Sequence, residues 1–491
     1  MKKCVVINEK DNVAVALVKL LKGEELCGTV LLEDIERGHK FALRPIKAGE
    51  KIIKYGEVIG SAKCDISQGE HVHTNNMRTD LDSKSEYKYN KAEIAPQEQR
   101  ESVEVEVYER AFGKVGIRNE LWVIPLVGCV NAQAKEIVER YRAEFGDSGT
   151  DGVFAFTHPY GCSQTGEDHL RTRTLLQCMV RHPNAGGVLV LGLGCENNTM
   201  KDFRATLGDY DEKRVRFLVA QDVGDEIAEG VKLLRELYFV AEKDRRVTKG
   251  IECLNVGLKC GGSDGLSGIT ANPLLGRFSD YMASVGGATV LTEVPEMFGA
   301  ERLLMARAKN EEVFRDIVGL INDFKDYYIN NGQPVYENPS PGNKAGGITT
   351  LEDKSLGCTQ KSGSGEVESV IKEGETIKSK GLTLLNGPGN DMVAVTNLAA
   401  AGCQMVLFTT GRGTPFGGFV PTVKVSTNTE LSERKKNWID FNAGDIVQDA
   451  SFEDKLQELI KFVAEVASGK KTKNEINNTR EIALFKTGVT L

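Results

Sequence analysis

The sequence predicts an α/β protein built from three parts, which we place at residues 1–95, 96–330 and 331–491. Its 491 residues exceed what one hydrophobic core usually supports. Short runs of alternating apolar and polar residues fill the first part, whereas apolar strands alternate with helical patterns in the later parts. We therefore expect a β-rich N-terminal module, a βα-repeating central domain and a C-terminal α/β domain.

The N-terminal module is predicted from glycine-separated runs such as 13–18 and 51–55. A short echo inside it, in which 46–52 returns as 66–72, predicts two hairpin turns. The stretch 83–101 is dense in Lys, Glu, Tyr, Gln and Asn and has few aliphatic residues, so we expect a linker there.

The central domain is predicted from apolar strands that are followed by helical patterns. The expected strands are 121–127, 152–156, 187–192, 215–219, 251–258 and 288–294, and the expected helices are 132–145, 167–181, 225–242 and 273–285. This array predicts a doubly wound sheet. An ankyrin array is the alternative for a 33-residue interval, but its Thr-Pro-Leu-His signature is absent.

The C-terminal domain begins, on this reading, after the Asn-, Pro- and Gly-rich stretch 331–341. Beyond it, 382–385, 405–409 and 423–426 predict strands, and 452–467 predicts a closing amphipathic helix.

Charge and composition exclude several classes of protein. The net charge of -8 and the absence of a long basic run argue against nucleic acid as a partner. No apolar run approaches the roughly 18 residues that a membrane span needs. Polar residues from Asn8 onward interrupt any signal peptide, so we expect a cytoplasmic protein. Eleven cysteines without a Cys-x-x-Cys pair indicate reduced thiols.

Two segments resemble nucleotide-binding motifs, but each lacks a residue that its motif requires. The stretch 192–197 follows a predicted strand, but Asn197 stands where a dinucleotide fingerprint has its third glycine. The stretch 342–347 is similar to a phosphate loop and lacks the Gly-Lys-Ser/Thr ending. We therefore do not expect NAD or ATP.

Cysteines recur in Gly-Cys-x-amide sequences at a constant interval of 33 residues. They are Cys129, Cys162 and Cys195, and Cys260 follows a further apolar run. The carboxyl ends of parallel strands are where α/β folds place ligands, so the four thiols are candidate metal ligands at one site. The alternative is that each packs as a small buried hydrophobe.

Histidines form a second candidate group. His71 and His73 share one face of an extended segment, so they can bind a metal or act as acid and base; a structural pair is the alternative. His158 and His169 flank the second Gly-Cys loop and can face the same cleft. We expect His182 and His39 to be structural.

Two polar loops suit a polyhydroxylated, acidic ligand. The loop 261–268 offers Ser263 and Asp264 for hydroxyl groups. After the apolar run 405–408, Arg412 can hold a carboxylate through two hydrogen bonds, and Lys344 is a second candidate cation. Ordinary turns are the alternative for both loops.

Taken together, seven segments give the chain its likeness to a known family. They are 69–76, 182–186, 192–198, 260–265, 267–273, 338–347 and 409–415. Their sequences (for example Gly-Glu-His-Val-His-Thr-Asn-Asn and Asn-Pro-Ser-Pro-Gly-Asn-Lys-Ala-Gly-Gly) are long and specific, and they span nearly the whole chain. The chain resembles the altronate/galactarate dehydratase family.

The resemblance implies an N-terminal SAF (β-clip) module and dependence on Fe2+ or Mn2+. It implies a hydro-lyase that dehydrates D-altronate to 2-dehydro-3-deoxy-D-gluconate in hexuronate catabolism; a galactarate or other sugar-acid dehydratase is the alternative, and a non-catalytic sugar-acid binding protein is a remote one. The resemblance therefore implies a small sugar acid as the ligand. A homo-oligomer is an alternative to a monomer.

The chemistry gives the candidate residues their roles. Removing the C2 proton of an aldonate builds charge beside a carboxylate, which a bound metal and cations can offset. His71 and His73 are then metal ligands or the acid and base, Arg412 or Lys344 holds the carboxylate, and Ser263 and Asp264 bind hydroxyls. The cysteines either hold iron, an iron–sulfur cluster included, or line the cleft around a mononuclear iron.

Overall fold

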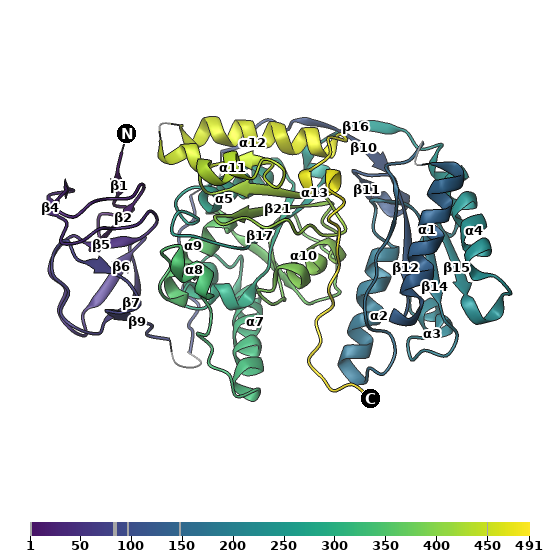
Figure 1. Cartoon of the computed structure of the whole chain (residues 1–491), viewed down its shortest axis with the longest axis horizontal. Coiled ribbons are helices and arrows are strands. Elements are labelled where there is room, and N and C mark those ends of the chain that lie inside the picture. The colour runs from purple at the N-terminus through teal and green to yellow at the C-terminus, as the bar shows by residue number, and fades with distance from the viewer. Residues whose placement is uncertain (1, 82–85, 96–97, 147–148, 449) are drawn as a thin grey trace.

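A computed structural model describes residues 2–81, 86–95, 98–146, 149–448 and 450–491 of the chain. Its three parts lie side by side along the longest axis (Figure 1). The N-terminal module lies at one end, and the central domain of the sequence lies at the other end. The C-terminal domain, which has the largest sheet, lies between them and is called the middle domain below. The predicted α/β class with a strand-rich N-terminus is confirmed. No helix in the described part of the chain is long and apolar enough to cross a membrane.

The N-terminal module consists of short strands in two small sheets, ordered β1-β2-β5-β8 and β6-β7-β9, with a separate β3–β4 hairpin. The strands are β1 (Cys4–Val5), β2 (Val13–Ala16), β3 (Glu25–Leu26), β4 (Thr29–Val30), β5 (Lys40–Ala42), β6 (Lys51–Lys54), β7 (Glu57–Ala62), β8 (His71–Val72) and β9 (Met77–Arg78). The echoed segments form matching turns, because Gly49 and Gly69 both have a φ of 81°, a conformation that favours glycine. They are not the predicted hairpin turns, because the strands that they connect, β5 with β6 and β7 with β8, belong to different sheets.

The predicted linker, 83–101, lies partly outside the described residues. Its described part forms no helix or strand and follows the middle domain. The Tyr89 hydroxyl donates to the Ala308 carbonyl at 3.0 Å, and the Ala92 N–H donates to the Ala306 carbonyl at 2.8 Å.

The central domain is a four-stranded parallel sheet in the order β13-β12-β14-β15. Its elements are β12 (Glu120–Pro125), α1 (Asn131–Phe145), β13 (Val153–Ala155), α2 (Gly166–Val180), β14 (Ala185–Gly192), α3 (Met200–Ala205), β15 (Val215–Val219) and α4 (Glu226–Ala241). Leu121 and Val123 pack toward α1 and α4, whereas Trp122 and Ile124 pack toward α2 and the middle domain. Both faces of the strand are therefore apolar, as a parallel sheet requires.

The middle domain is a seven-stranded parallel sheet in the order β19-β20-β18-β17-β21-β22-β23. Its strands are β17 (Asn255–Cys260), β18 (Ala288–Leu291), β19 (Val367–Ile371), β20 (Gly381–Leu385), β21 (Met405–Thr410), β22 (Thr422–Ser426) and β23 (Phe441–Asn442). Its helices are α5 (Ala271–Ser284), α6 (Glu301–Ala306), α7 (Glu311–Asn330), α8 (Pro341–Ala345), α9 (Leu351–Thr359), α10 (Asp391–Ala400), α11 (Thr429–Arg434), α12 (Phe452–Ala467) and α13 (Lys473–Ile476).

The sheet topology places the second domain boundary earlier in the chain than we predicted. We expected the central domain to extend to residue 330, but β17 pairs with β21 and β18 pairs with β20, so both strands belong to the C-terminal sheet. The boundary lies near residue 250 instead. Pairing between strands that are about 150 residues apart leaves no local trace in the sequence.

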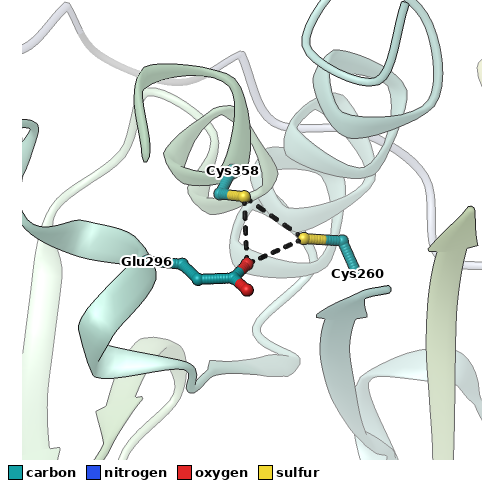
Figure 2. A group of neighbouring side chains, drawn as sticks. All are labelled: Cys260, Glu296 and Cys358. Atoms are coloured by element: carbon teal, nitrogen blue, oxygen red, sulfur yellow. Dashed lines mark hydrogen bonds between the residues drawn. The ribbon is translucent and has the colours of Figure 1, made fainter. Parts of the chain in front are cut away.

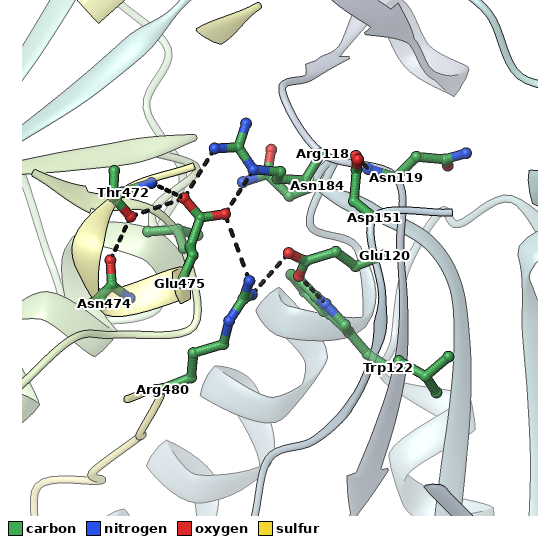
Figure 3. Close-up of polar contacts among 12 residues, drawn as sticks. Arg118, Asn119, Glu120, Trp122, Asp151, Asn184, Thr472, Asn474, Glu475 and Arg480 are labelled. Atoms are coloured by element: carbon green, nitrogen blue, oxygen red, sulfur yellow. Dashed lines mark hydrogen bonds and ion pairs between the residues drawn. The ribbon is translucent and has the colours of Figure 1, made fainter. Parts of the chain in front are cut away.

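The central and middle domains are joined by a small antiparallel sheet and a buried ion-pair network. The sheet, ordered β11-β10-β16, contains β10 (Glu104–Glu109), β11 (Val115–Gly116) and β16 (Arg246–Gly250). In the network, Arg118 lies 2.7 Å from Glu475, and Arg480 lies 2.7 Å from Glu120 (Figure 3). These side chains are nearly inaccessible to solvent, so the two domains form a continuous body.

Candidate active site

A crevice opens at the carboxyl edge of the seven-stranded sheet, between β17 and β21. From β17 the chain continues on one side of the strand to β18, and later it returns on the other side as β21. Open parallel sheets bind ligands at such a switch point. The loops 261–268 and 411–414 follow these two strands and are held together, since the N–H groups of Gly411 and Arg412 donate to the Gly262 carbonyl at 3.1 and 2.9 Å.

Three histidines of the N-terminal module cluster against α8, whose residue Ala345 lines this crevice. The His39 Nε2 donates to the Ala345 carbonyl at 3.3 Å, and the His73 Nε2 donates to the Lys344 carbonyl at 2.9 Å. The His71 Nε2 lies 3.0 Å from the His39 Nδ1, and the ring centroids are 5.1–5.3 Å apart. His39, which we expected to be structural alone, is therefore part of the same cluster.

Burial holds the histidine cluster neutral. It lowers the pKa of His39 and His73 below the ordinary value, and with the two neighbouring rings it lowers the pKa of His71 to about 3. Two of the ring nitrogens face backbone carbonyls, so those nitrogens carry the protons. The cluster therefore offers neutral imidazoles at neutral pH.

Glycines allow the module to approach the middle domain closely. A Cβ atom at Gly265 would lie 1.9 Å from the Gly38 carbonyl oxygen, and one at Gly347 would lie 2.2 Å from the same atom. Any larger residue would separate the two surfaces. The polar loops 261–268 and 338–347 thus meet the histidine-bearing module because their glycines leave room for it.

A cavity of about 890 Å³ lies between the module and the middle domain. Its charged lining residues are Lys19, Glu36, Arg37, Asp264, Arg412, Glu430, Glu433 and Arg434. Arg412 packs beside α8, where a Cβ atom at Gly342 would lie 3.7 Å from its Nε. Within the described part of the chain no carboxylate pairs with Arg412, so its guanidinium is available to a ligand.

The two predicted hydroxyl-binding residues have different surroundings. Asp264 is buried, which raises its pKa, and its oxygens accept hydrogen bonds from Thr427 at 3.0 Å and from Asn428 at 3.2 Å. These hydrogen bonds connect the loop 261–268 to the segment that follows β22. Ser263 is 1% exposed, and its Oγ has no partner among the described residues. Although residues 261–265 have the Gly-x-Ser-x-Gly spacing of a hydrolase elbow, no base in the described part of the chain contacts this hydroxyl.

Figure 2 shows a buried group of two thiols and a carboxylate, which Lys354 connects to α8. Cys260 ends β17, Cys358 lies on α9, and Glu296 lies in the 3-10 turn η6 (Val294–Met297). The two Sγ atoms are 3.3 Å apart, and the Glu296 Oε2 is 3.4 Å from Cys260 and 3.2 Å from Cys358. Among the described residues, this is the one group of three potential ligands whose donor atoms all lie within 4.8 Å of one another.

Lysines surround the thiol group and connect it to the crevice. The Lys361 Nζ is 2.9 Å from the Cys260 Sγ, and the hydrogen bond from Cys358 together with the Lys361 charge lowers the Cys260 pKa to about 6. The Lys354 Nζ is 2.8 Å from Glu296 and 3.2 Å from the Asn343 Oδ1 on α8. The same short helix therefore contacts the histidine cluster directly and is connected to the thiol group through Lys354.

The donor set fits a transition-metal ion. Two sulfurs and a carboxylate oxygen converge in a buried place, and thiolates favour metals such as iron over magnesium or calcium. The histidine cluster fits less well, because its hydrogen bonds to the carbonyls of α8 occupy two of the nitrogens that a metal would need.

The four predicted cysteine ligands do not share one site. Cys260 belongs to the thiol group, whereas Cys129, Cys162 and Cys195 are exposed at the edge of the central sheet. The prediction of one convergent set is wrong because the strand that precedes Cys260 belongs to the other sheet.

The remaining predicted histidines have mainly structural contacts. The His158 Nε2 donates to the Pro125 carbonyl at 2.8 Å, and the His182 Nε2 donates to the Cys403 carbonyl at 3.2 Å. His169 contacts Arg173 at 2.8 Å.

Sequence reasoning missed Glu296, Cys358 and the lysines around them. One signal was present, since Gly357-Cys358-Thr359-Gln360 repeats the Gly-Cys-x-amide pattern of the other cysteines. Glu296 carries no such signal, because only the packing of η6 against α9 brings it to the thiols.

Fold and site define a multidomain α/β protein with a polar, cation-lined crevice between a β-rich module and a parallel sheet. Family models cover most of the chain: the altronate/galactarate dehydratase SAF domain at 2–80, the D-galactarate dehydratase/altronate hydrolase second domain at 107–242, and the D-galactarate/altronate dehydratase C-terminal domain at 251–490. The chain belongs to the altronate/galactarate dehydratase family.

Relatives match it over their full length. The altronate dehydratase of Escherichia coli is 56% identical over 490 residues, which cover 99% of both chains, and that of Bacillus subtilis is 56% identical over 497 residues, which cover 100% of both. The galactarate dehydratase (L-threo-forming) of Escherichia coli is 34% identical over 95% of this chain and 92% of its own.

Proposed function

We propose that the protein is a hydro-lyase that dehydrates D-altronate to 2-dehydro-3-deoxy-D-gluconate. The observation that carries this proposal is full-length similarity to two altronate dehydratases, together with a crevice whose free cation suits a sugar acid. The reaction removes the C2 proton and the C3 hydroxyl, and the resulting enol ketonises.

Charge in the cavity favours an aldonate over an aldarate. Most cationic side chains of the lining are already paired: Lys19 with Glu36 at 2.6 Å, and Arg37 and Arg434 with Glu430 at 2.7 and 3.6 Å. Arg412 is the lining cation without a carboxylate partner in the described residues. One free guanidinium matches the single carboxylate of D-altronate, whereas galactarate carries two.

Arg412 would hold the substrate carboxylate beside α8, and Lys344 is the alternative cation. A guanidinium binds a carboxylate through two parallel hydrogen bonds, which fixes the direction of the C2–H bond. Cys260, Cys358 and Glu296 would hold the metal, ferrous iron in our proposal, which supplies Lewis acidity to the site when bound.

The histidine cluster would move the proton. Both nitrogens of His73 are hydrogen-bonded, to Lys344 and to Thr74, which gives this residue a positioning role. The His71 Nδ1 has no hydrogen bond with the described residues, so we assign it as the atom that takes the C2 proton. The approach of a substrate carboxylate raises the pKa of this imidazole, since a nearby negative charge favours the imidazolium.

A substrate panel tests the proposal. Protein purified without oxygen and supplied with ferrous iron is incubated with D-altronate, galactarate and other sugar acids, and 2-keto-3-deoxy acids are measured. We expect D-altronate to give the highest kcat/KM, and we expect His71→Ala to abolish turnover while the circular dichroism spectrum is unchanged. Faster turnover of galactarate, or an active His71→Ala variant, would contradict the respective assignment.

A further inference from the structure

We propose that the central domain holds an iron–sulfur cluster bound by the thiolates of Cys129, Cys162 and Cys195. This site is separate from the crevice and from the buried thiol group of the middle domain. The three cysteines follow β12, β13 and β14, which are neighbours in the order β13-β12-β14. Because the strands are parallel, their carboxyl ends lie at one edge of the sheet. All three thiols are free and exposed.

The first two of these cysteines lie in loops that touch. The Gly128 N–H, one residue before the first cysteine, donates to the Tyr160 carbonyl at 2.8 Å. A Cβ atom at Gly161 would lie 2.0 Å from the Leu126 carbonyl oxygen, so only glycine allows this approach. The first and second loops are therefore in backbone contact immediately beside their cysteines.

The second and third loops are joined in the same way. The Asn198 N–H donates to the Gly161 carbonyl at 3.0 Å, and the Ser163 N–H donates to the Asn197 Oδ1 at 2.9 Å. These contacts involve the residues on either side of the second cysteine in the sequence. The second loop thus contacts both of the other loops.

Buried polar atoms without partners belong to the second loop and to the helices that follow the first two loops. Gln164 is 4% exposed; its Oε1 accepts from the Gly161 N–H, and its Nε2 has no partner among the described residues. The same is true of the Thr172 Oγ1, the His169 Nδ1 and the Asn131 Oδ1. Buried polar groups are rarely left unpaired, so this concentration indicates a missing ligand. The Gln164 amide and the Thr172 hydroxyl are donors of the kind that bind the sulfur atoms of a cluster, whereas the Asn131 Oδ1 can only accept a hydrogen bond.

A cluster can be held by thiols that stand farther apart than the ligands of a single ion. Ligands of one ion must converge closely, and the described residues contain one such group of three, Cys260, Glu296 and Cys358. In a cluster each thiolate binds a different iron, so the sulfurs stand farther apart. Three thiolates would leave a fourth iron open to an oxygen ligand or water.

Reconstitution of the full-length protein tests this site. Protein is incubated without oxygen with ferrous iron and sulfide, and bound iron, acid-labile sulfide, visible absorption and the electron paramagnetic resonance of the reduced sample are measured. We expect wild-type protein to bind iron and sulfide together. Cys162→Ser should lose the sulfide and the absorption band. Cys64→Ser, which changes an exposed cysteine of the N-terminal module, and Cys260→Ser should both retain them.

Alkylation of wild-type protein gives a second measurement that needs no variant. In reconstituted protein the three cysteines should be protected from iodoacetamide, as read by mass spectrometry, whereas Cys64 should react as it does in cluster-free protein. Iron bound without sulfide, equal alkylation of the three cysteines in both samples, or unchanged sulfide in a folded triple serine variant would each overturn the proposal.

Discussion

Arg412 illustrates how one side chain can determine substrate position. Its backbone is fixed by the Gly262 carbonyl, and its guanidinium lies beside α8 in the cavity wall. Its sequence position after an apolar run predicts a loop residue, but only the structure shows that no carboxylate of the described residues neutralises it. The residue is therefore a substrate ligand in the proposed reaction.

We expect Arg412→Lys to lower kcat/KM for D-altronate by roughly tenfold to a thousandfold. The charge is kept, but the planar two-point grip is lost, and a charge-assisted hydrogen bond contributes about 1.5–3 kcal/mol. Arg44→Lys, at an exposed site on the N-terminal module, is the control and should have no effect. If the Arg412→Lys variant had wild-type kinetics, Arg412 would not be the carboxylate ligand, and Lys344 would be the remaining candidate.

At the scale of elements, α9 anchors the N-terminal module to the middle domain. The helix begins at a Thr350 cap, and all nine of its residues are buried. Asp353 in its first turn lies 2.9 Å from both Lys40 on β5 and Lys54 on β6. Although burial alone would raise its pKa, the two ammonium groups hold the Asp353 pKa well below its ordinary value.

We expect Asp353→Asn to destabilise the docked module by about 3–5 kcal/mol, because it leaves two buried ammonium groups without a counter-charge. Urea unfolding followed by circular dichroism measures the loss. Asp65→Asn, which breaks an exposed ion pair with Lys47 on the same module, should cost less than about 1 kcal/mol. Equal effects of the two variants would contradict the anchoring role.

His182 makes the packing between the central and middle domains sensitive to acid. Its Nδ1 accepts from the Asn184 N–H and its Nε2 donates to the Cys403 carbonyl, and burial lowers its pKa to about 3 from an ordinary 6.5. Because the folded pKa is the lower one, the contribution to stability is complete above pH 6.5 and is lost as the pH falls toward 3.

We expect this histidine to account for about 2–3 kcal/mol of lost unfolding free energy between about pH 7 and pH 4.5. The free energy of unfolding is measured across this range for wild-type protein and for His182→Gln. The variant should be less stable at pH 7 but should show a shallower dependence on pH. Parallel curves would show that His182 does not titrate in this range.

Across the whole molecule, two candidate metal sites lie in different domains. Cys260, Cys358 and Glu296 belong to the middle domain, which forms the crevice together with the N-terminal module, and the central sheet carries the three exposed thiols. The buried Arg118–Glu475 and Arg480–Glu120 pairs join the central domain to the sheet (Figure 3).

We expect protein treated with a chelator to lose turnover of D-altronate and to recover it with ferrous iron, and partly with manganese. The physical reason is that proton removal beside a carboxylate needs strong electrostatic stabilisation. Iron content and activity are measured in parallel. Calcium serves as the control ion, because thiolate ligands bind it poorly. Full turnover by rigorously metal-free protein would refute the metal-assisted mechanism.

The sequence by itself determined the α/β class, the strand-rich N-terminus and most central elements, because these depend on local periodicity. For example, β15 (Val215–Val219) of the central domain has the predicted bounds, and so does α12 (Phe452–Ala467) of the C-terminal part. The polar loops 261–268 and 411–414 were likewise recognisable, since turn chemistry is local.

Only the tertiary structure decided which elements share a sheet and which side chains meet. Strand pairing across long sequence separations placed Cys260 with Cys358 and Glu296 rather than with the other predicted thiols. Docking of the N-terminal module added His39 to the two predicted histidines. Such contacts depend on the summed packing of distant surfaces, and no local pattern of residues encodes them.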